Sequence, residues 1–134
     1  MQDPRSAALL GKTIDGRYHL ASVLGYGGFS TVYHAEHTRL PRDFAVKVLH
    51  SLFTDDSDQV QRFRQEVRAV AGLHHSNIID VLDFGQDPEV GWYLVLSSLA
   101  GETLDARRRR PGTMPIVDIH SVILQTAAAL DAAH

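Results

Sequence analysis

The stretch Gly25-Tyr26-Gly27-Gly28-Phe29-Ser30-Thr31-Val32 decides the fold, because its glycines stand between two segments that favour β-strands. Residues 18–24 precede the glycines, and residues 31–35 follow them with β-branched and aromatic side chains. Two strands around a glycine cluster predict a β-hairpin. Backbone N–H groups that no side chain obstructs can bind phosphates, so the loop is a candidate phosphate site. By itself, the loop fits a glycine turn without a ligand equally well.

Two other phosphate-binding motifs are excluded. A Rossmann loop runs from a strand into a helix, whereas this loop runs into Thr31-Val32-Tyr33, which favours a strand. A Walker loop ends in G-K-[ST], as Gly11-Lys12-Thr13 does, but Ser6 occupies the position of its first glycine. A glycine-rich hairpin that folds over phosphates is the remaining phosphate-binding interpretation.

The spacing of apolar residues predicts three strands, a helix, two strands and two further helices, in that order. The strands are expected at 18–24, 31–35, 44–49, 78–84 and 92–96, and the helices at 58–73, 104–110 and 115–134. This order predicts the α+β class, with a small antiparallel five-stranded sheet and one helix after a loose lead-in over 1–17. The helix at 115–134 is apolar along one side, and no later segment is present to cover that side.

Composition narrows the function classes. Acidic residues outnumber basic ones by 16 to 13 and the net charge is −3, which argues against a nucleic-acid partner. The absence of cysteine excludes disulfides, thiolate metal sites and thiol nucleophiles. We expect no membrane segment, because no stretch of about 18 uncharged apolar residues occurs. Asp3 and Pro4 argue against a signal peptide, so a cytoplasmic location is expected.

Lys47 and Glu66 are predicted to form an ion pair. Lys47 lies in a strand with no polar face, so its ammonium group is expected to be partly buried and to need a partner. Glu66 falls on the apolar arc of the helix at 58–73, so it is also expected to face the core. The alternative is that both side chains extend to water.

Histidines and arginines give weaker signals. His34 with His37, and His74 with His75, lack a third ligand, so no metal site is predicted. The run Arg107–Arg110 is interpreted as a solvated helix face, with an anionic-partner patch as the alternative.

The ordered set of segments resembles the protein kinase family, and the bacterial serine/threonine kinases in particular. The glycine loop resembles G-x-G-x-x-G-x-V, Phe44-Ala45-Val46-Lys47 resembles V-A-I-K, and Glu66 resembles the glutamate of helix C. Residues 73–79 resemble L-x-H-P-N-I-V, and Gly101-Glu102-Thr103-Leu104 resembles the G-x-T-L that follows the hinge. The resemblance implies an N-lobe at 18–96, a hinge at 97–103 and the first helices of an incomplete C-lobe at 104–134.

The resemblance also implies an ATP site. Lys47 would hold the α- and β-phosphates and Glu66 would hold Lys47 in place. Leu96 would be the gatekeeper, and Ser97 and Leu99 would offer hinge backbone groups to the adenine. The implied site residues are Leu24, Gly25, Tyr26, Gly27, Gly28, Phe29, Ser30, Thr31, Val32, Ala45, Lys47, Glu66, Leu96, Ser97 and Leu99.

Apolar residues complete the implied pocket. Leu24 and Val32 would cover the adenine, and Ala45 would line the same space. Val70 and Val81 match the regulatory hydrophobic spine of the family. Ser30 departs from the third glycine of the family motif, and this change slightly stiffens the loop.

The catalytic part of the family pattern does not follow residue 134. No H-R-D-x-x-x-x-N and no D-F-G with its activation loop come after the last helix, so we expect no catalytic residue and no Mg²⁺ ligand here. ATP is the expected ligand, and Mg²⁺ and a protein substrate belong to the complete kinase. This chain alone is expected to be inactive. The alternative is a non-catalytic regulatory module that pairs with a partner, or with itself, through residues 115–134.

Overall fold

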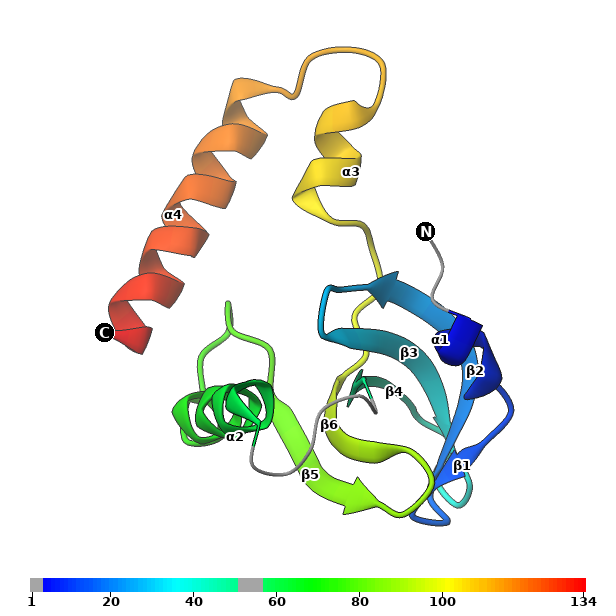
Figure 1. The fold of residues 1–134 in the computed structure, drawn as a ribbon. Coiled ribbons are helices and arrows are strands. Elements are labelled where there is room, and N and C mark those ends of the chain that lie inside the picture. The colour runs from blue at the N-terminus through cyan, green and yellow to red at the C-terminus, as the bar shows by residue number, and fades with distance from the viewer. Residues whose placement is uncertain (1–3, 51–56) are drawn as a thin grey trace. The chain divides into compact units, whose positions relative to one another are not determined.

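The computed structural model describes residues 4–50 and 57–134. Its elements are α1 (Pro4–Ala8), β1 (Thr13–Ile14), β2 (Tyr18–Tyr26), β3 (Ser30–His37), β4 (Asp43–Leu49), α2 (Asp58–Ala71), β5 (Val81–Asp87), β6 (Gly91–Ser97), α3 (Leu104–Arg109) and α4 (Ile116–Ala133) (Figure 1). They form two compact units, which we describe separately. The first unit holds the chain up to residue 72 together with residues 80–98, and the second holds residues 73–79 and 99–134.

The first unit is built on one antiparallel sheet of six strands, in the order β1-β2-β3-β4-β6-β5. The prediction of five strands was therefore wrong by one. The additional strand is β1, whose Ile14 is fully buried. Residues 1–17 were also predicted to be a loose lead-in, but α1 and β1 form there.

The sheet curls (Figure 1), and polar side chains join its two ends. Lys12 forms an ion pair with Glu89 at 3.1 Å, and the hydroxyl of Tyr18 donates to Oδ2 of Asp83 at 2.9 Å. Arg17 also pairs with Asp83, at 2.9 Å. Burial and the bond to Asp83 raise the pKa of Tyr18 to about 12. These contacts hold β1 and β2 against β5.

The turn between β5 and β6 is fixed by Asp87. Burial alone would raise the pKa of this carboxyl, but the backbone N–H groups of Asp15, Glu89 and Val90 donate to it and hold its pKa below the ordinary value. Gly91 completes the turn with a φ of +91°, which a residue with a side chain rarely adopts.

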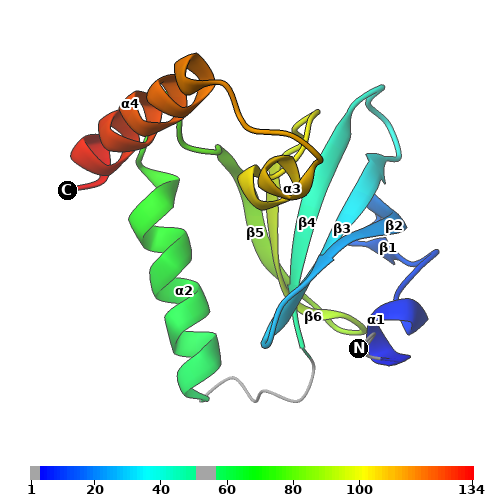
Figure 2. The same ribbon diagram turned by 90° about the horizontal axis from the view of Figure 1, so that it is seen from above.

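Two apolar clusters occupy the two faces of the sheet. Inside the curl lie Ile14, Tyr18, Leu20, Tyr33, Ala35, Phe44, Val46, Val48, Val90, Tyr93 and Val95. On the other face, Leu49 and Leu94 pack with Val60, Phe63 and Val67 of α2. The second cluster therefore attaches α2 to the sheet, beside β5 (Figure 2).

Local sequence sets the bounds of α2. The Oγ of Ser57 accepts a hydrogen bond from the N–H of Val60 at 3.3 Å, which caps the first turn, and Asp58 complements the positive end of the helix dipole. Gly72 ends the helix. Its buried residues recur at helical spacing, as predicted.

The second unit contains α3 and α4. Thr103 caps α3 by accepting from the N–H of Ala106 at 3.1 Å. The amide of Asn77 donates to Gln125 at 3.0 Å, which ties residues 73–79 to α4.

The length of α4 bears on the membrane prediction. This helix has 18 residues with a mean hydropathy of 1.3, none of it is buried, and by length and composition alone it could cross a membrane. It also carries Asp118 and Asp131, and one such helix is weak evidence for a span. The absence of a membrane segment stays a prediction.

Candidate nucleotide-binding site

The glycine stretch forms the predicted hairpin. Gly25 lies opposite Val32 in the β2–β3 ladder, and the N–H of Gly27 donates to the carbonyl of Ser30 at 2.7 Å to close the turn. A Cβ added at Gly27 would lie 3.1 Å from that carbonyl oxygen, so local packing favours glycine there. A Cβ at Gly25 or Gly28 would meet nothing within 4 Å. Internal packing does not explain these two glycines, whereas the close approach of a ligand would.

Strand register brings the predicted adenine-pocket residues to one face. Val32 lies opposite Lys47 in the β3–β4 ladder, and Ala45 lies opposite Leu96 in the β4–β6 ladder. Directly opposed residues share a face, and residues two apart along a strand do as well. Leu24 is the extra residue of a β-bulge in β2 and is 58% exposed, so most of its side chain is uncovered.

Thr31 differs from its neighbour Val32. Its side chain is buried, and its Oγ1 forms hydrogen bonds with Oγ of Ser6 at 2.7 Å and with Nε2 of His50 at 3.0 Å. Only the backbone of Thr31 is therefore available to a ligand in this structure. Tyr26 and Phe29 are about half exposed at the loop.

The predicted ion pair between β4 and α2 is confirmed. The Nζ of Lys47 donates to Oε1 of Glu66 at 3.1 Å and lies 6.0 Å from the centre of the Phe63 ring. The Lys47 side chain is 24% exposed, in agreement with partial burial. The prediction that Glu66 faces the core was wrong, because its side chain is 53% exposed. A rotation of 100° per residue placed Glu66 among the apolar residues of α2, but the sheet does not cover the part of the helix where Glu66 lies.

A cavity of about 190 Å³ lies between the glycine loop, β4 and α2. We call it the loop–helix pocket, and its lining residues are Gly28, Phe29, Ser30, Lys47, Leu49, Gln59, Arg62, Phe63 and Glu66. This volume is smaller than the roughly 300–1,000 Å³ typical of sites for whole ligands, and it suits a phosphate group better than a nucleotide.

Sequence reasoning missed the part of this pocket that α2 supplies. Gln59, Arg62 and Phe63 precede Glu66 by seven, four and three residues, so they share its side of the helix. That spacing was visible in the sequence. The approach of the glycine loop to this side of α2 was not.

The predicted hinge falls where the two units join. Ser97 ends β6, and its N–H donates to the carbonyl of Asp80 at 3.2 Å. Leu99 belongs to the second unit and is 74% exposed. Of the predicted spine residues, Val81 packs against the cluster under α2, and Val70 is half-buried.

The letters D-F-G do occur in this chain, at residues 83–85 of β5. There Asp83 holds Tyr18, and the Phe84 ring stacks on Trp92 at 5.3 Å. A Cβ at Gly85 would lie 2.8 Å from the hydroxyl oxygen of Tyr93. Packing and hydrogen bonding account for all three residues. These residues therefore stabilise β5, and they are not the metal-binding motif of kinases.

The histidines that were considered for metal binding have local structural contacts. His34 lies 3.3 Å from Asp43, and the Nδ1 of His37 accepts from the N–H of Leu40 at 3.0 Å. Across residues 4–50 and 57–134, no three His, Cys, Asp or Glu side chains gather into a group that could hold a metal ion. We assign no residue to Mg²⁺, and the absence of a metal site from this chain stays a prediction.

The arginine run is internally paired. Each arginine lies within 4 Å of a carboxylate of the second unit: Arg107 at 3.7 Å from Asp118, Arg108 and Arg109 at 3.1 and 2.9 Å from Asp105, and Arg110 at 3.0 Å from Glu102. Arg108 and Arg109 share one carboxylate, so these pairs balance most of the positive charge of the run and favour the solvated-face interpretation.

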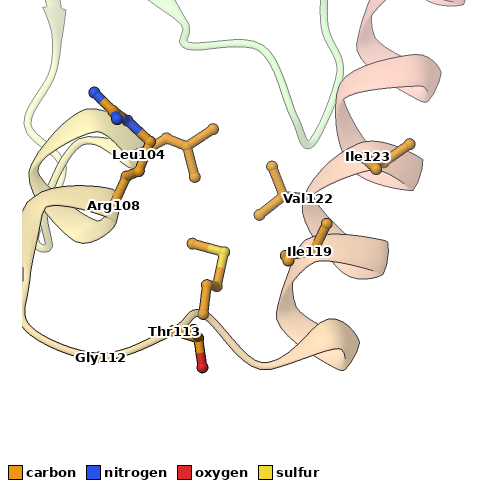
Figure 3. Close-up of a pocket in the computed structure, with 8 residues that line it drawn as sticks. Leu104, Arg108, Gly112, Thr113, Ile119, Val122 and Ile123 are labelled. Carbon is orange, nitrogen blue, oxygen red and sulfur yellow. The ribbon is translucent and has the colours of Figure 1, made fainter.

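A second hollow, of about 510 Å³, lies between α3 and α4 (Figure 3). Figure 3 shows Leu104 directed toward Val122 and Ile119 across it. Its one charged residue is Arg108, whose guanidinium is paired with Asp105. The walls are almost wholly apolar, and they lack the donors that nucleotide phosphates need.

Comparison with known proteins decides the family. A model of the protein kinase domain matches residues 18–134. The chain belongs to the protein kinase family. The serine/threonine-protein kinase PrkC of Bacillus subtilis is 32% identical over 126 residues, and PknA of Mycobacterium tuberculosis is 37% identical over 129 residues. The solved kinase domain of M. tuberculosis PknI matches with a TM-score of 0.74 at 28% identity.

These kinases are longer than this chain. The matches cover 94%, 93% and 92% of this chain, but 19% of PrkC, 30% of PknA and 49% of the PknI kinase-domain chain. The glycine loop, Lys47 and Glu66 all lie within the matched residues, so the geometry described above belongs to the kinase fold.

Proposed function

We propose that this chain forms the ATP-binding part of a serine/threonine protein kinase, whose complete form transfers the γ-phosphate of ATP to protein hydroxyls. The observation that carries the proposal is the Lys47–Glu66 ion pair beside the glycine loop. A carboxylate orients the ammonium group, and the space beside Gly25 and Gly28 is open. This arrangement is suited to binding phosphates. Relatives that are named serine/threonine-protein kinases support the choice of hydroxyl substrates.

The adenine would lie against the apolar face formed by Val32, Ala45 and Leu96. Its edge would bind the backbone carbonyl of Ser97, since the N–H of this residue already donates to Asp80. The phosphates would enter the loop–helix pocket, whose volume suits one or two phosphate groups.

We expect this chain alone to bind ATP without transferring its phosphate. Phosphoryl transfer depends on a base that orients the hydroxyl and on Mg²⁺ that balances the developing charge. The sequence has no H-R-D, and no group of three metal-ligating side chains gathers among the described residues. Lys47 and the glycine backbone can position the phosphates, but they do not supply these two functions.

Titration of ATP into wild type and Lys47→Met tests the proposal. Lysine occurs only at positions 12 and 47, so Lys12→Met is the matched control. Wild type and Lys12→Met should bind ATP alike, and Lys47→Met should bind at least about tenfold more weakly, because it loses a charge-assisted contact. Equal affinity in all three proteins would refute the site.

A second candidate function is a non-catalytic module that pairs with a partner, or with another copy, through residues 115–134. The observation that favours it is the apolar surface of α4, where Ile116, Val117, Ile123, Leu124 and Leu130 are 55–81% exposed. Sedimentation of wild type and Ile123→Glu tests self-association. A defined oligomer that Ile123→Glu dissociates would support pairing of this chain with itself, and monomers throughout would refute it.

A further inference from the structure

The loop–helix pocket contains a cation that the proposed site has not used. Lys47 and Glu66 balance each other, because their side chains form an ion pair at 3.1 Å. Arg62 lines the same pocket and makes no ion pair with any residue in the described part of the chain. The pocket therefore has a net positive charge, and that charge comes from Arg62.

The position of Arg62 is set by α2. Phe63 is buried under the helix and holds this turn against the sheet. Arg62 precedes Phe63, and Glu66 lies one turn further along, so Arg62 and Glu66 face the glycine loop at neighbouring levels of the helix. Across the pocket lies Gly28, whose N–H donates no hydrogen bond within the described residues and whose missing Cβ leaves open space.

We propose that Arg62 is a second cationic ligand for the terminal phosphates of the bound nucleotide, and that it sets a preference for ATP over AMP and adenosine. The proposal rests on the proposed function of the site. A nucleoside triphosphate carries several negative charges, whereas the Lys47–Glu66 pair is neutral overall. A guanidinium group offers planar, paired N–H donors that match two phosphate oxygens, and its charge does not depend on pH.

Binding of ATP, ADP, AMP, adenosine and inorganic phosphate to wild type, Arg62→Gln and Arg62→Lys tests the proposal by calorimetry. Arg68→Gln is the matched control, because it removes the same charge from the same helix but outside the pocket lining. Thermal unfolding of each variant confirms that the fold is retained. Arg62→Gln should lose about tenfold in affinity for ATP, the loss expected for one charge-assisted contact, with no change for adenosine. Arg62→Lys should retain part of the affinity, and Arg68→Gln should match wild type.

Each other outcome is decisive. Unchanged ATP affinity in Arg62→Gln, or an equal loss in Arg68→Gln, would overturn the role of Arg62 while leaving the nucleotide site in place. Loss of affinity for adenosine as well would show that Arg62 acts on the fold of the site and not on phosphate. Loss of inorganic phosphate binding with unchanged ATP binding would assign the pocket to a different phosphate ligand. A wild type that binds neither adenosine nor ATP would refute the proposed function, and this proposal with it.

Discussion

Removal of the Lys47–Glu66 ion pair should cost little stability and much ATP affinity. The two side chains are 24% and 53% exposed, so water screens the pair. Exposed pairs contribute about 0.2–1 kcal/mol, whereas breaking a fully buried pair costs about 3–5 kcal/mol. For this geometry we expect a coupling energy of about 0.5–1 kcal/mol. That corresponds to a change in Tm of about 2–4 °C for a protein of this size.

A double-mutant cycle measures this energy. Lys47→Met keeps the apolar stem of the side chain, and Glu66→Gln keeps the shape of the carboxylate, so each variant removes mainly charge. Urea unfolding of wild type, both single variants and the double variant gives the coupling, and ATP titration of the same four proteins gives the affinity. Both single variants should bind ATP at least about tenfold more weakly. A coupling of about 3 kcal/mol or more would contradict the exposure of the two side chains and make the pair part of the core.

Three further predictions follow from the first unit. Gly85→Ala should destabilise the protein by about 1–2 kcal/mol in urea unfolding, because the new Cβ would meet the buried ring of Tyr93. Gly28→Ala is the control and should change the stability by less than about 1 kcal/mol. Similar losses in the two variants would contradict the packing described for β5. The lowered pKa of Asp87 means that its ionised form stabilises the fold above the unfolded-state pKa of about 3.9, and this stabilisation is lost as the pH falls through the native value. Wild type should therefore lose more stability than Asp87→Asn between about pH 5 and pH 2, and parallel acid-unfolding curves would show that Asp87 does not contribute. Val46→Ala, at a fully buried position, should cost about 2–3 kcal/mol, and a loss under about 1 kcal/mol would place Val46 outside the core.

Strong local signals explain what the sequence could predict. The glycine cluster between two strands predicted the hairpin, because few residues other than glycine tolerate the close approach seen at Gly27. Apolar residues at helical spacing predicted α2, and alternation along β4 predicted that Lys47 shares a face with Ala45. In each case the signal lies within one element, so no knowledge of tertiary packing was needed.

Features that depend on contacts between distant segments were not predicted. β1 has two residues, too few to show a period, and it is held by pairing with β2. The strand expected at 78–84 is β5 at Val81–Asp87, because residues 73–79 belong to the second unit and Asp87 fixes the turn. The exposure of Glu66 and the place of Arg62 in the pocket both depend on how far the sheet and loop extend over α2.

Protection of lysine by ATP tests the central claim most directly. Lysine occurs only at positions 12 and 47, so mass spectrometry after reaction with an amine-reactive acetylating reagent reports each site separately. Lys12 precedes β1, pairs with Glu89 and does not line the loop–helix pocket. It is therefore an internal control. If Lys47 contacts the nucleotide phosphates, saturating ATP should slow acetylation of Lys47 several-fold while Lys12 reacts at an unchanged rate, and adenosine should protect less. Equal acetylation of Lys47 with and without ATP, at concentrations up to several millimolar, would contradict the nucleotide site.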